Sequence, residues 1–271
     1  MSRAPIRLVA AKPQALVAVA SGKGGVGKTW LSITLAQAFA FSGERALLVD
    51  GDLGLANVDV QLGIDPTTDI ASVVAGRIQL ADAAQGVQGG AGALGGFDVI
   101  AGRSGSGALA DLPSEIAGRI AVGALALSAH YDRIVLDLGA GVHANILRMA
   151  AMSPRQIIVV TDEPTSLTDA YAFIKLLRQL KRESEPWIVV NLADSKNDGA
   201  KTYQALAQAC ESFLKFKPEL LGVIPRDPRV RDAIRAQMPL MSRSPQSTAA
   251  EAVSRIAQEI QRETVAPQAS R

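Results

Sequence analysis

The hydrophobic positions of the chain fall into short, continuous runs separated by longer segments of mixed polarity. Strands that are buried on both faces are apolar throughout and do not alternate between apolar and polar residues. The runs end at or next to residues that interrupt regular structure, such as Gly, Pro, Asp and Asn. We therefore expect buried strands over residues 15–20, 45–50, 97–102, 131–139, 155–162, 186–191 and 220–225.

Segments with helical patterns lie between most of these runs. The first of them is apolar on nearly all sides, which is typical of a helix enclosed within a domain, and Gly43 is a suitable residue to end it. Strands that alternate with helices predict an α/β fold with a mostly parallel sheet, covered by helices on both faces and joined by right-handed crossovers. The expected helices include residues 29–43, 166–180, 201–214 and 248–263.

The pattern continues without an internal repeat, which indicates one domain over residues 15–263. We expect residues 1–14 to form a flexible leader and residues 264–271 a flexible tail. The glycine-rich residues 86–96 predict a mobile surface loop and not a linker between domains.

Composition narrows the classes of protein. The 271 residues carry 28 Lys and Arg against 26 Asp and Glu, a net charge of +2 that is too small to indicate a nucleic-acid-binding protein. The single cysteine, Cys210, excludes an internal disulfide and fits a reducing compartment. We find no signal peptide and no apolar stretch of membrane-spanning length, so we expect a cytoplasmic protein.

The first expected strand is followed by the sequence SGKGGVGKTW, residues 21–30. Residues 22–29 fit the pattern G-x-x-x-x-G-K-T, in which backbone N–H groups and a helix N-terminus cradle phosphates. In this pattern Lys28 reaches the β- and γ-phosphates, and the Thr29 hydroxyl suits a Mg²⁺ ion. The motif sits between a strand and a helix, which predicts a three-layer P-loop NTPase fold.

Carboxylates follow two other expected strands. Asp50 and Asp52 end the second strand, and Asp137 ends the strand over residues 131–139. Ligands of parallel sheets gather at the carboxyl ends of the strands, so these oxygens should converge near the phosphates as a magnesium site. Asp137 fits the Walker B role, and Gly139 and Gly141 could approach a γ-phosphate closely.

With the early Lys23, the sequence KGGVGKT resembles the deviant Walker A motif of the MinD/ParA ATPases, and the resemblance extends over nearly the whole chain. Residues 50–64, 162–177 and 222–235 are similar to one branch, the flagellar-number regulators of the FlhG/FleN type. The run EPTSLTDAY within residues 162–177 is the most specific to that branch.

The resemblance implies roles for further residues. Lys23 would reach across a dimer interface to the nucleotide of the partner subunit. Asp52 would position or activate the attacking water, and Asp50 would support Mg²⁺ and the first switch. Asn57 would lie in that switch, where the partner subunit would contact it.

The resemblance also implies that the base is adenine. Asn191 would hydrogen-bond the base, although a simple turn residue at a strand end is an alternative reading. Pro225 and Arg226 would flank the base. Together the motif and the resemblance assign nucleotide binding to Gly22, Lys23, Gly24, Gly25, Val26, Gly27, Lys28, Thr29, Trp30, Asn191, Pro225 and Arg226.

The chain departs from the family pattern in two places. Trp30 stands where many relatives have Thr or Ser, so only its backbone N–H can reach the α-phosphate, and we expect its side chain to pack into the core. Residues 1–14 lack the short motif with which FlhG-type proteins activate their partner GTPase, which leaves that activity open.

Three other features have plain explanations. An apolar stripe in the last helix lacks Trp, Phe and Leu and a basic excess, so we expect it to pack against the domain, with membrane binding as the alternative. His143 has no orienting carboxylate and is expected to be a bystander. The arginines of the basic run should form a solvated face: Arg226, Arg229, Arg231, Arg235 and Arg243.

The resemblance implies an ATP-dependent, dimerising switch that hydrolyses ATP slowly with Mg²⁺ and regulates flagellar number or placement. The alternative is a ParA- or MinD-type positioning ATPase that binds DNA or membrane. Expected partners are a second copy of the chain, a flagellar GTPase of the FlhF type, and flagellar switch or regulator proteins; DNA is not expected. A site at the inner membrane or cell pole stays open. A metal-cluster ATPase is not expected, because Cys210 is the one cysteine and lies far in sequence from the switch loops.

Overall fold

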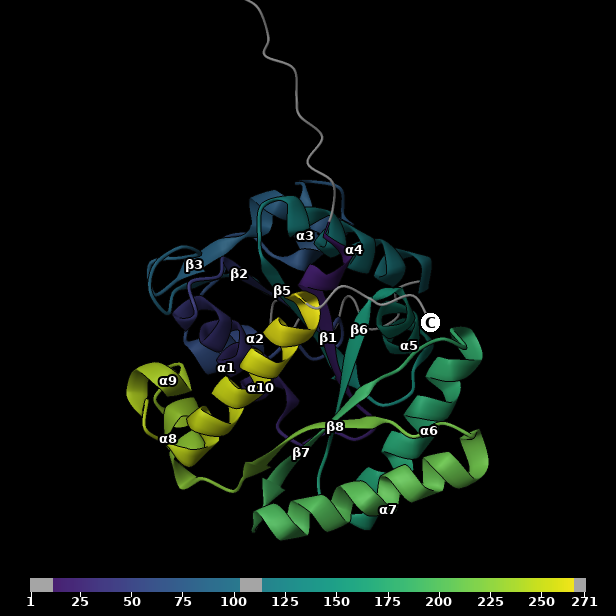
Figure 1. Cartoon of the computed structure of the whole chain (residues 1–271). Coiled ribbons are helices and arrows are strands. Elements are labelled where there is room, and N and C mark those ends of the chain that lie inside the picture. The colour runs from purple at the N-terminus through teal and green to yellow at the C-terminus, as the bar shows by residue number, and fades with distance from the viewer. Residues whose placement is uncertain (1–11, 103–113, 266–271) are drawn as a thin grey trace, which may run out of the picture.

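The computed structural model describes residues 12–102 and 114–265. In these ranges one eight-stranded sheet has the order β3-β4-β2-β5-β1-β6-β7-β8, and helices cover both of its faces (Figure 1). The strands are β1 (Leu16–Ser21), β2 (Ala46–Gly51), β3 (Gln85–Val87), β4 (Phe97–Ile100), β5 (Arg133–Ala140), β6 (Arg155–Val160), β7 (Trp187–Ala193) and β8 (Glu219–Pro225).

All neighbouring strands are parallel except β3, which pairs antiparallel with β4. The mostly parallel α/β sheet that the apolar runs predict is therefore confirmed. The helices are α1 (Lys28–Phe41), α2 (Val58–Leu62), α3 (Ile70–Val74), α4 (Ser114–Ala126), α5 (Ala144–Met152), α6 (Pro164–Leu180), α7 (Lys196–Leu214), α8 (Pro228–Arg235), α9 (Leu240–Arg243) and α10 (Thr248–Val265).

Two hydrophobic clusters fill the space between the three layers. One joins the sheet to α1 and α10, and the other joins the opposite face to α4, α5, α6 and α7. Side chains alternate across a strand, so neighbours on β1 serve different clusters: Val17 belongs to the first and Leu16 to the second. Helix α1 is buried on nearly all sides because it lies between the sheet and α10.

The predicted loop over residues 86–96 is wrong at its start. Residues Gln85–Val87 form the edge strand β3, which is too short to show an alternating pattern in the sequence. The segment that follows is held to the sheet by Asp98, whose carboxylate accepts a hydrogen bond from the Ala91 N–H at 2.9 Å.

The predicted boundaries of the leader and the tail lie close to the limits of the described ranges. Lys12 donates its N–H to the Ser128 hydroxyl at 2.8 Å and pairs with Asp132 at 3.1 Å, and Pro13–Ala15 forms a 3-10 turn. Residues 1–11 of the leader lie outside the described ranges. At the other end α10 continues to Val265, past the expected boundary at residue 263.

The apolar stripe of α10 faces the domain. Ala249, Val253, Ile256 and Ile260 are each at most 2% exposed and pack in the cluster that contains α1. Figure 1 shows α10, in yellow, lying across the face of the molecule beside α1. The prediction that this stripe packs against the domain is confirmed. Of the helices in the described ranges, none combines the length and the apolar character that crossing a bilayer needs.

Candidate nucleotide-binding site

The phosphate loop connects β1 to α1 at the carboxyl edge of the sheet, beside the ends of β5 and β6. Gly27 precedes α1 in the left-handed conformation, with φ of 85°, which glycine adopts without strain. A Cβ on Gly22 would stand 2.3 Å from the carbonyl group of Asp169, so only glycine lets the loop approach α6 this closely. The loop is thus built for a backbone that wraps around a ligand.

Lys28 lies buried at the first turn of α1. Its Nζ is 3.0 Å from Oδ1 of Asp137, and the two side chains are 7% and 1% exposed. The Ser32 hydroxyl, one turn further along α1, donates to the same carboxylate oxygen at 2.8 Å. The sequence predicts both ends of this ion pair but not Ser32, although its spacing of one helical turn from Lys28 could have pointed to it.

Asp50 and Asp137 are register partners on the adjacent strands β2 and β5. The Asp50 carboxylate accepts the backbone N–H groups of Asp52 at 3.1 Å and Val58 at 3.3 Å. Burial, followed by the negative charge of Asp137, raises the pKa of Asp50 to about 7. Two buried carboxylates this close favour a bound cation, and their oxygens are the ligands that Mg²⁺ prefers.

Thr29, the third expected metal ligand, follows Lys28 in α1 and is half-buried. In the described ranges no three His, Cys, Asp or Glu side chains converge as a metal cage. Mg²⁺ usually binds through one or two carboxylates together with water and substrate phosphates. The donor set of Asp50, Asp137 and Thr29 fits that mode of binding.

The segments after β2 and β5 enclose an open cavity of about 610 Å³. Asp52, Gly139 and His143 line it, and the position of a Cβ on Gly139 lies 3.3 Å from Asp52 Oδ1. Asp52 also accepts the Leu55 N–H at 2.9 Å. Asn57 donates from Nδ2 to the Leu55 carbonyl at 2.5 Å and precedes α2. Asp52 therefore faces a space large enough for water and phosphate.

Gly141 connects this cavity to the phosphate loop. Its N–H donates to the Ser21 carbonyl at 2.9 Å, and its φ of 96° lies in the left-handed region. The structure thus brings the predicted switch glycines to the same edge as the loop, with Gly139 beside Asp52.

Lys23, the second lysine of the loop, is turned toward α6 of its own chain. Its Nζ forms an ion pair with Glu163 and a 2.9 Å hydrogen bond with the Thr165 hydroxyl. The Lys23 and Glu163 side chains are 35% and 60% exposed, so the pair is accessible from solvent. Our sequence reasoning missed Glu163 and Thr165, although they follow β6 at the same edge of the sheet.

Asn191 lies fully buried near the end of β7. Its Nδ2 donates to the Val26 carbonyl at 2.7 Å, while its Oδ1 is buried without a hydrogen-bond partner. An orphaned buried acceptor is unusual and fits a donor group supplied by a ligand. Pro225 ends β8 nearby, and Arg226 is exposed and pairs with Asp194 at 3.2 Å.

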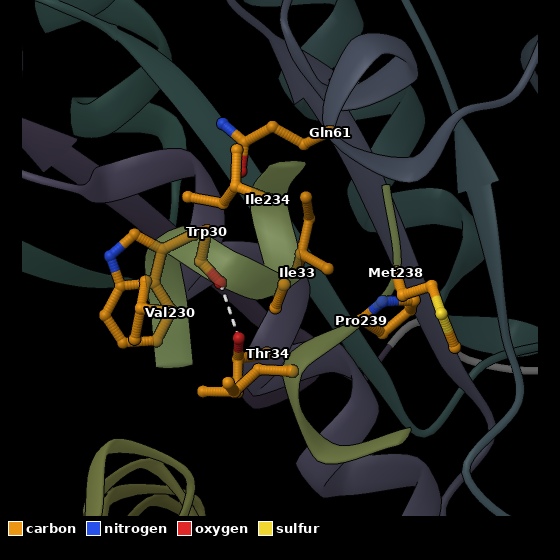
Figure 2. Close-up of a pocket in the computed structure, with 10 residues that line it drawn as sticks. Trp30, Ile33, Thr34, Gln61, Val230, Ile234, Met238 and Pro239 are labelled. Atoms are coloured by element: carbon orange, nitrogen blue, oxygen red, sulfur yellow. Dashed lines mark hydrogen bonds between the residues drawn. The ribbon is translucent and has the colours of Figure 1, made fainter. Parts of the chain in front are cut away.

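Trp30 packs as expected. It is 6% exposed and borders a small pocket with Ile33, Val230, Ile234 and Pro239 (Figure 2). Its backbone carbonyl accepts the Thr34 hydroxyl at 2.7 Å. The indole thereby joins α1 to α8 and to the segment before α9.

The remaining expectations concern residues outside the loop. His143 precedes α5 and lines the cavity with Asp52, and Cys210 is buried in α7. All five arginines of the basic run are exposed, as expected for a solvated face.

Comparison with known proteins agrees with this geometry. Residues 17–240 match the family model described as CobQ/CobB/MinD/ParA nucleotide binding domain. The chain is 37% identical over 249 residues to the antiactivator FleN of Pseudomonas aeruginosa, covering 92% of this chain and 86% of FleN. It is 28% identical over 242 residues to the flagellum site-determining protein YlxH of Helicobacter pylori, covering 89% and 80%.

Among solved structures, the cell division ATPase MinD of Pyrococcus furiosus is similar with a TM-score of 0.77 and 25% identity. The match covers 92% of this chain and 99% of that one. Because the family model spans most of the chain and the relatives align over nearly its whole length, this protein belongs to the CobQ/CobB/MinD/ParA family of nucleotide-binding domains.

Proposed function

We propose that the protein is an ATP-driven, dimerising switch that regulates the number or placement of flagella. The observation that supports a dimerising switch is the presence of two lysines in one phosphate loop. Lys28 is buried beside the predicted metal carboxylates, whereas Lys23 is held at the accessible edge of the site. The similarity to FleN and YlxH supports the flagellar role.

Binding of ATP would begin at the phosphate loop. Loop N–H groups and the N-terminus of α1 would hold the phosphates, and Lys28 would move its charge from Asp137 to the β- and γ-phosphates. Asp50, Asp137 and Thr29 would hold Mg²⁺, directly or through water, and the ion would neutralise phosphate charge. Asn191 Oδ1 would accept a hydrogen bond from the adenine amino group.

Hydrolysis would use Asp52 to orient the attacking water in the cavity beside Gly139. Phosphoryl transfer depends mainly on placement and charge neutralisation, so a strong base is not needed. Lys23 would leave Glu163 and reach the nucleotide of the partner subunit when two copies meet. Because one cation arrives only on dimerisation, a single subunit would hydrolyse ATP slowly.

The ATP-bound dimer would present the surface that partner proteins recognise. We propose flagellar switch or regulator proteins and a GTPase of the FlhF type as those partners. Residues 1–14 do not contain the short motif with which FlhG-type proteins often activate such a GTPase, so we propose binding of the GTPase but not its activation through that segment. A MinD-type role in division-site placement is the second candidate, favoured by the similarity to the Pyrococcus furiosus protein.

The test is genetic and biochemical. A strain that lacks the gene should show altered flagellar number or placement, and the wild-type gene should restore both. A gene that encodes Lys28→Ala should not restore them, although the protein accumulates to a normal level. Unchanged flagella together with misplaced division septa would instead support the MinD-type role.

A further inference from the structure

The indole ring of Trp30 borders the phosphate loop directly. If Gly27 carried a Cβ, that atom would stand 2.6 Å from Nε1 and 3.1 Å from Cδ1 of the indole. Asn191 Nδ2 lies 2.4 Å from the same point. The nitrogen edge of Trp30 and the amide of Asn191 therefore flank the same residue of the loop.

Both side chains have unused hydrogen-bonding capacity at this place. Asn191 Oδ1 is buried without a donor. Among the described residues none accepts a hydrogen bond from the Trp30 indole N–H, and this N–H is not one of the buried unpaired atoms, so it reaches solvent although the residue as a whole is 6% exposed. An indole N–H that is accessible beside the phosphate loop can donate a hydrogen bond to a ligand that enters there.

The position of the indole identifies the part of a nucleotide that it would meet. In the sheet, β1 lies between β5 and β6. Asp50 and Asp137, the expected cation ligands near the terminal phosphates, lie on the β5 and β2 side. Asn191 lies on the opposite side, on β7. The Trp30 N–H lies beside Asn191 and so faces the nucleoside end of the site.

The rest of the ring is fixed by packing. Trp30 and Val230 line the same pocket, and Figure 2 shows the indole nitrogen on the edge turned away from Thr34 and Pro239. Ile33 of α1 and Val230 and Ile234 of α8 line the pocket beside the ring, and such surroundings limit its orientation, as a preorganised donor requires. A phenylalanine would fill much of the same space but would lack the N–H.

We propose that Trp30 is a nucleotide-positioning residue whose indole Nε1–H donates a hydrogen bond to an oxygen at the ribose or α-phosphate end of a bound adenine nucleotide. The indole would thus replace the hydroxyl that many relatives carry at this position. The inference rests on the proposed nucleotide binding. It adds that the side chain contacts the ligand and does more than pack.

The test compares nucleotide affinity in two variants by calorimetry with MgADP and with a non-hydrolysable ATP analogue. Trp30→Phe removes the N–H and part of the ring, whereas benzothienylalanine at position 30 keeps the shape and removes only the N–H. Both should bind each nucleotide about tenfold more weakly, because a hydrogen bond to the ligand is lost. The ratio of the two affinities should stay the same, because the γ-phosphate is not involved.

A second readout uses fluorescence. The chain has two tryptophans, so Trp187→Phe leaves Trp30 as the only tryptophan, whose emission can be excited selectively over that of the tyrosines. MgADP should shift or quench its emission. Unchanged affinity in the benzothienylalanine protein, or unchanged Trp30 emission at saturating MgADP, would overturn the inference. Failure of the wild-type protein to bind MgADP or the analogue would instead reject nucleotide binding itself.

Discussion

Burial of the Asp50 carboxyl group makes the free energy of unfolding depend on pH. Its pKa is raised from 3.8 to about 7, by burial first and by Asp137 second. An acid with a raised pKa in the folded state keeps its proton while the unfolded chain has lost it. The free energy of unfolding then falls as pH rises between the two values and is level above the higher one.

For the ligand-free protein, Asp50→Asn should remove this dependence. The free energy of unfolding of the wild type, relative to that of the variant, should fall by at most about 1.4 kcal/mol per pH unit between pH 4 and 7. Urea unfolding of both proteins across this range measures the difference between their free energies of unfolding. The contributions of the other titrating groups are common to both proteins and cancel in this difference. A constant difference from pH 4 to 8 would show that Asp50 has an ordinary pKa.

The position of the Lys23 side chain is also set by contacts within its own chain. In the single chain it is held by Glu163 and Thr165, and it must leave them to reach a partner. Glu163→Gln weakens this hold, so half-maximal dimerisation should need about twofold to fivefold less ATP, since exposed ion pairs are weak. Glu185→Gln is the matched control, because Glu185 is also exposed but lies outside the site. Equal ATP requirements in the two variants would exclude the holding role.

At the scale of elements, the start of α1 depends on Gly27. A side chain there meets a left-handed backbone and two neighbours, Asn191 Nδ2 at 2.4 Å and Trp30 Nε1 at 2.6 Å. Gly43, just after α1, has a nearly equal φ of 84° but nothing within 4 Å of a Cβ. Two alanine substitutions therefore separate backbone strain from crowding.

We expect Gly43→Ala to lower the free energy of unfolding by about 1 kcal/mol, which is the cost of the backbone conformation. Gly27→Ala should lower it by about 3 kcal/mol, because crowding adds to the strain. Urea denaturation measures both. Equal losses would mean that the loop relaxes freely around a methyl group.

Helix α10 is an element whose role follows from its buried stripe. Ile256 is 2% exposed and meets β8, where a Cβ on Gly222 would stand 2.6 Å from its Cγ1. Ile256→Ala should lower the free energy of unfolding by about 3 kcal/mol, whereas exposed Arg255→Ala should change it by less than about 0.5 kcal/mol. Thermal or urea unfolding of the two variants and the wild type measures these losses. A small loss for Ile256→Ala would mean that α10 detaches easily, as a membrane-seeking helix would.

At the scale of the whole molecule, the strands of the sheet could be predicted from the sequence, because each is a continuous run of buried apolar residues. The strands that meet at the site are apolar because both faces are covered, and the loop motif places Lys28 without reference to the rest of the fold. Asp50 and Asp137 both lie near the carboxyl ends of parallel strands, so we could expect their carboxylates to converge. That the two residues are register partners became known only from the structure.

The contacts that the sequence missed depend on tertiary placement. Ser32 meets Asp137 only because β5 lies beside β1, and Glu163 meets Lys23 only because α6 begins beside the phosphate loop. Strand β3 is defined by backbone pairing over Gln85–Val87, which leaves almost no pattern in side chains. Such features could be inferred only after the sheet order was known.

The central claim is that ATP brings two copies together and that Lys23 is needed for this. Light scattering of the wild type, of Lys23→Ala and of Asp52→Ala, in which we expect hydrolysis to be blocked, tests it most directly when each is measured with MgADP and with MgATP. We expect monomers with MgADP, a dimer of Asp52→Ala with MgATP, and monomeric Lys23→Ala with either nucleotide. If the wild type and Asp52→Ala both stay monomeric with MgATP bound, the dimerising switch is contradicted.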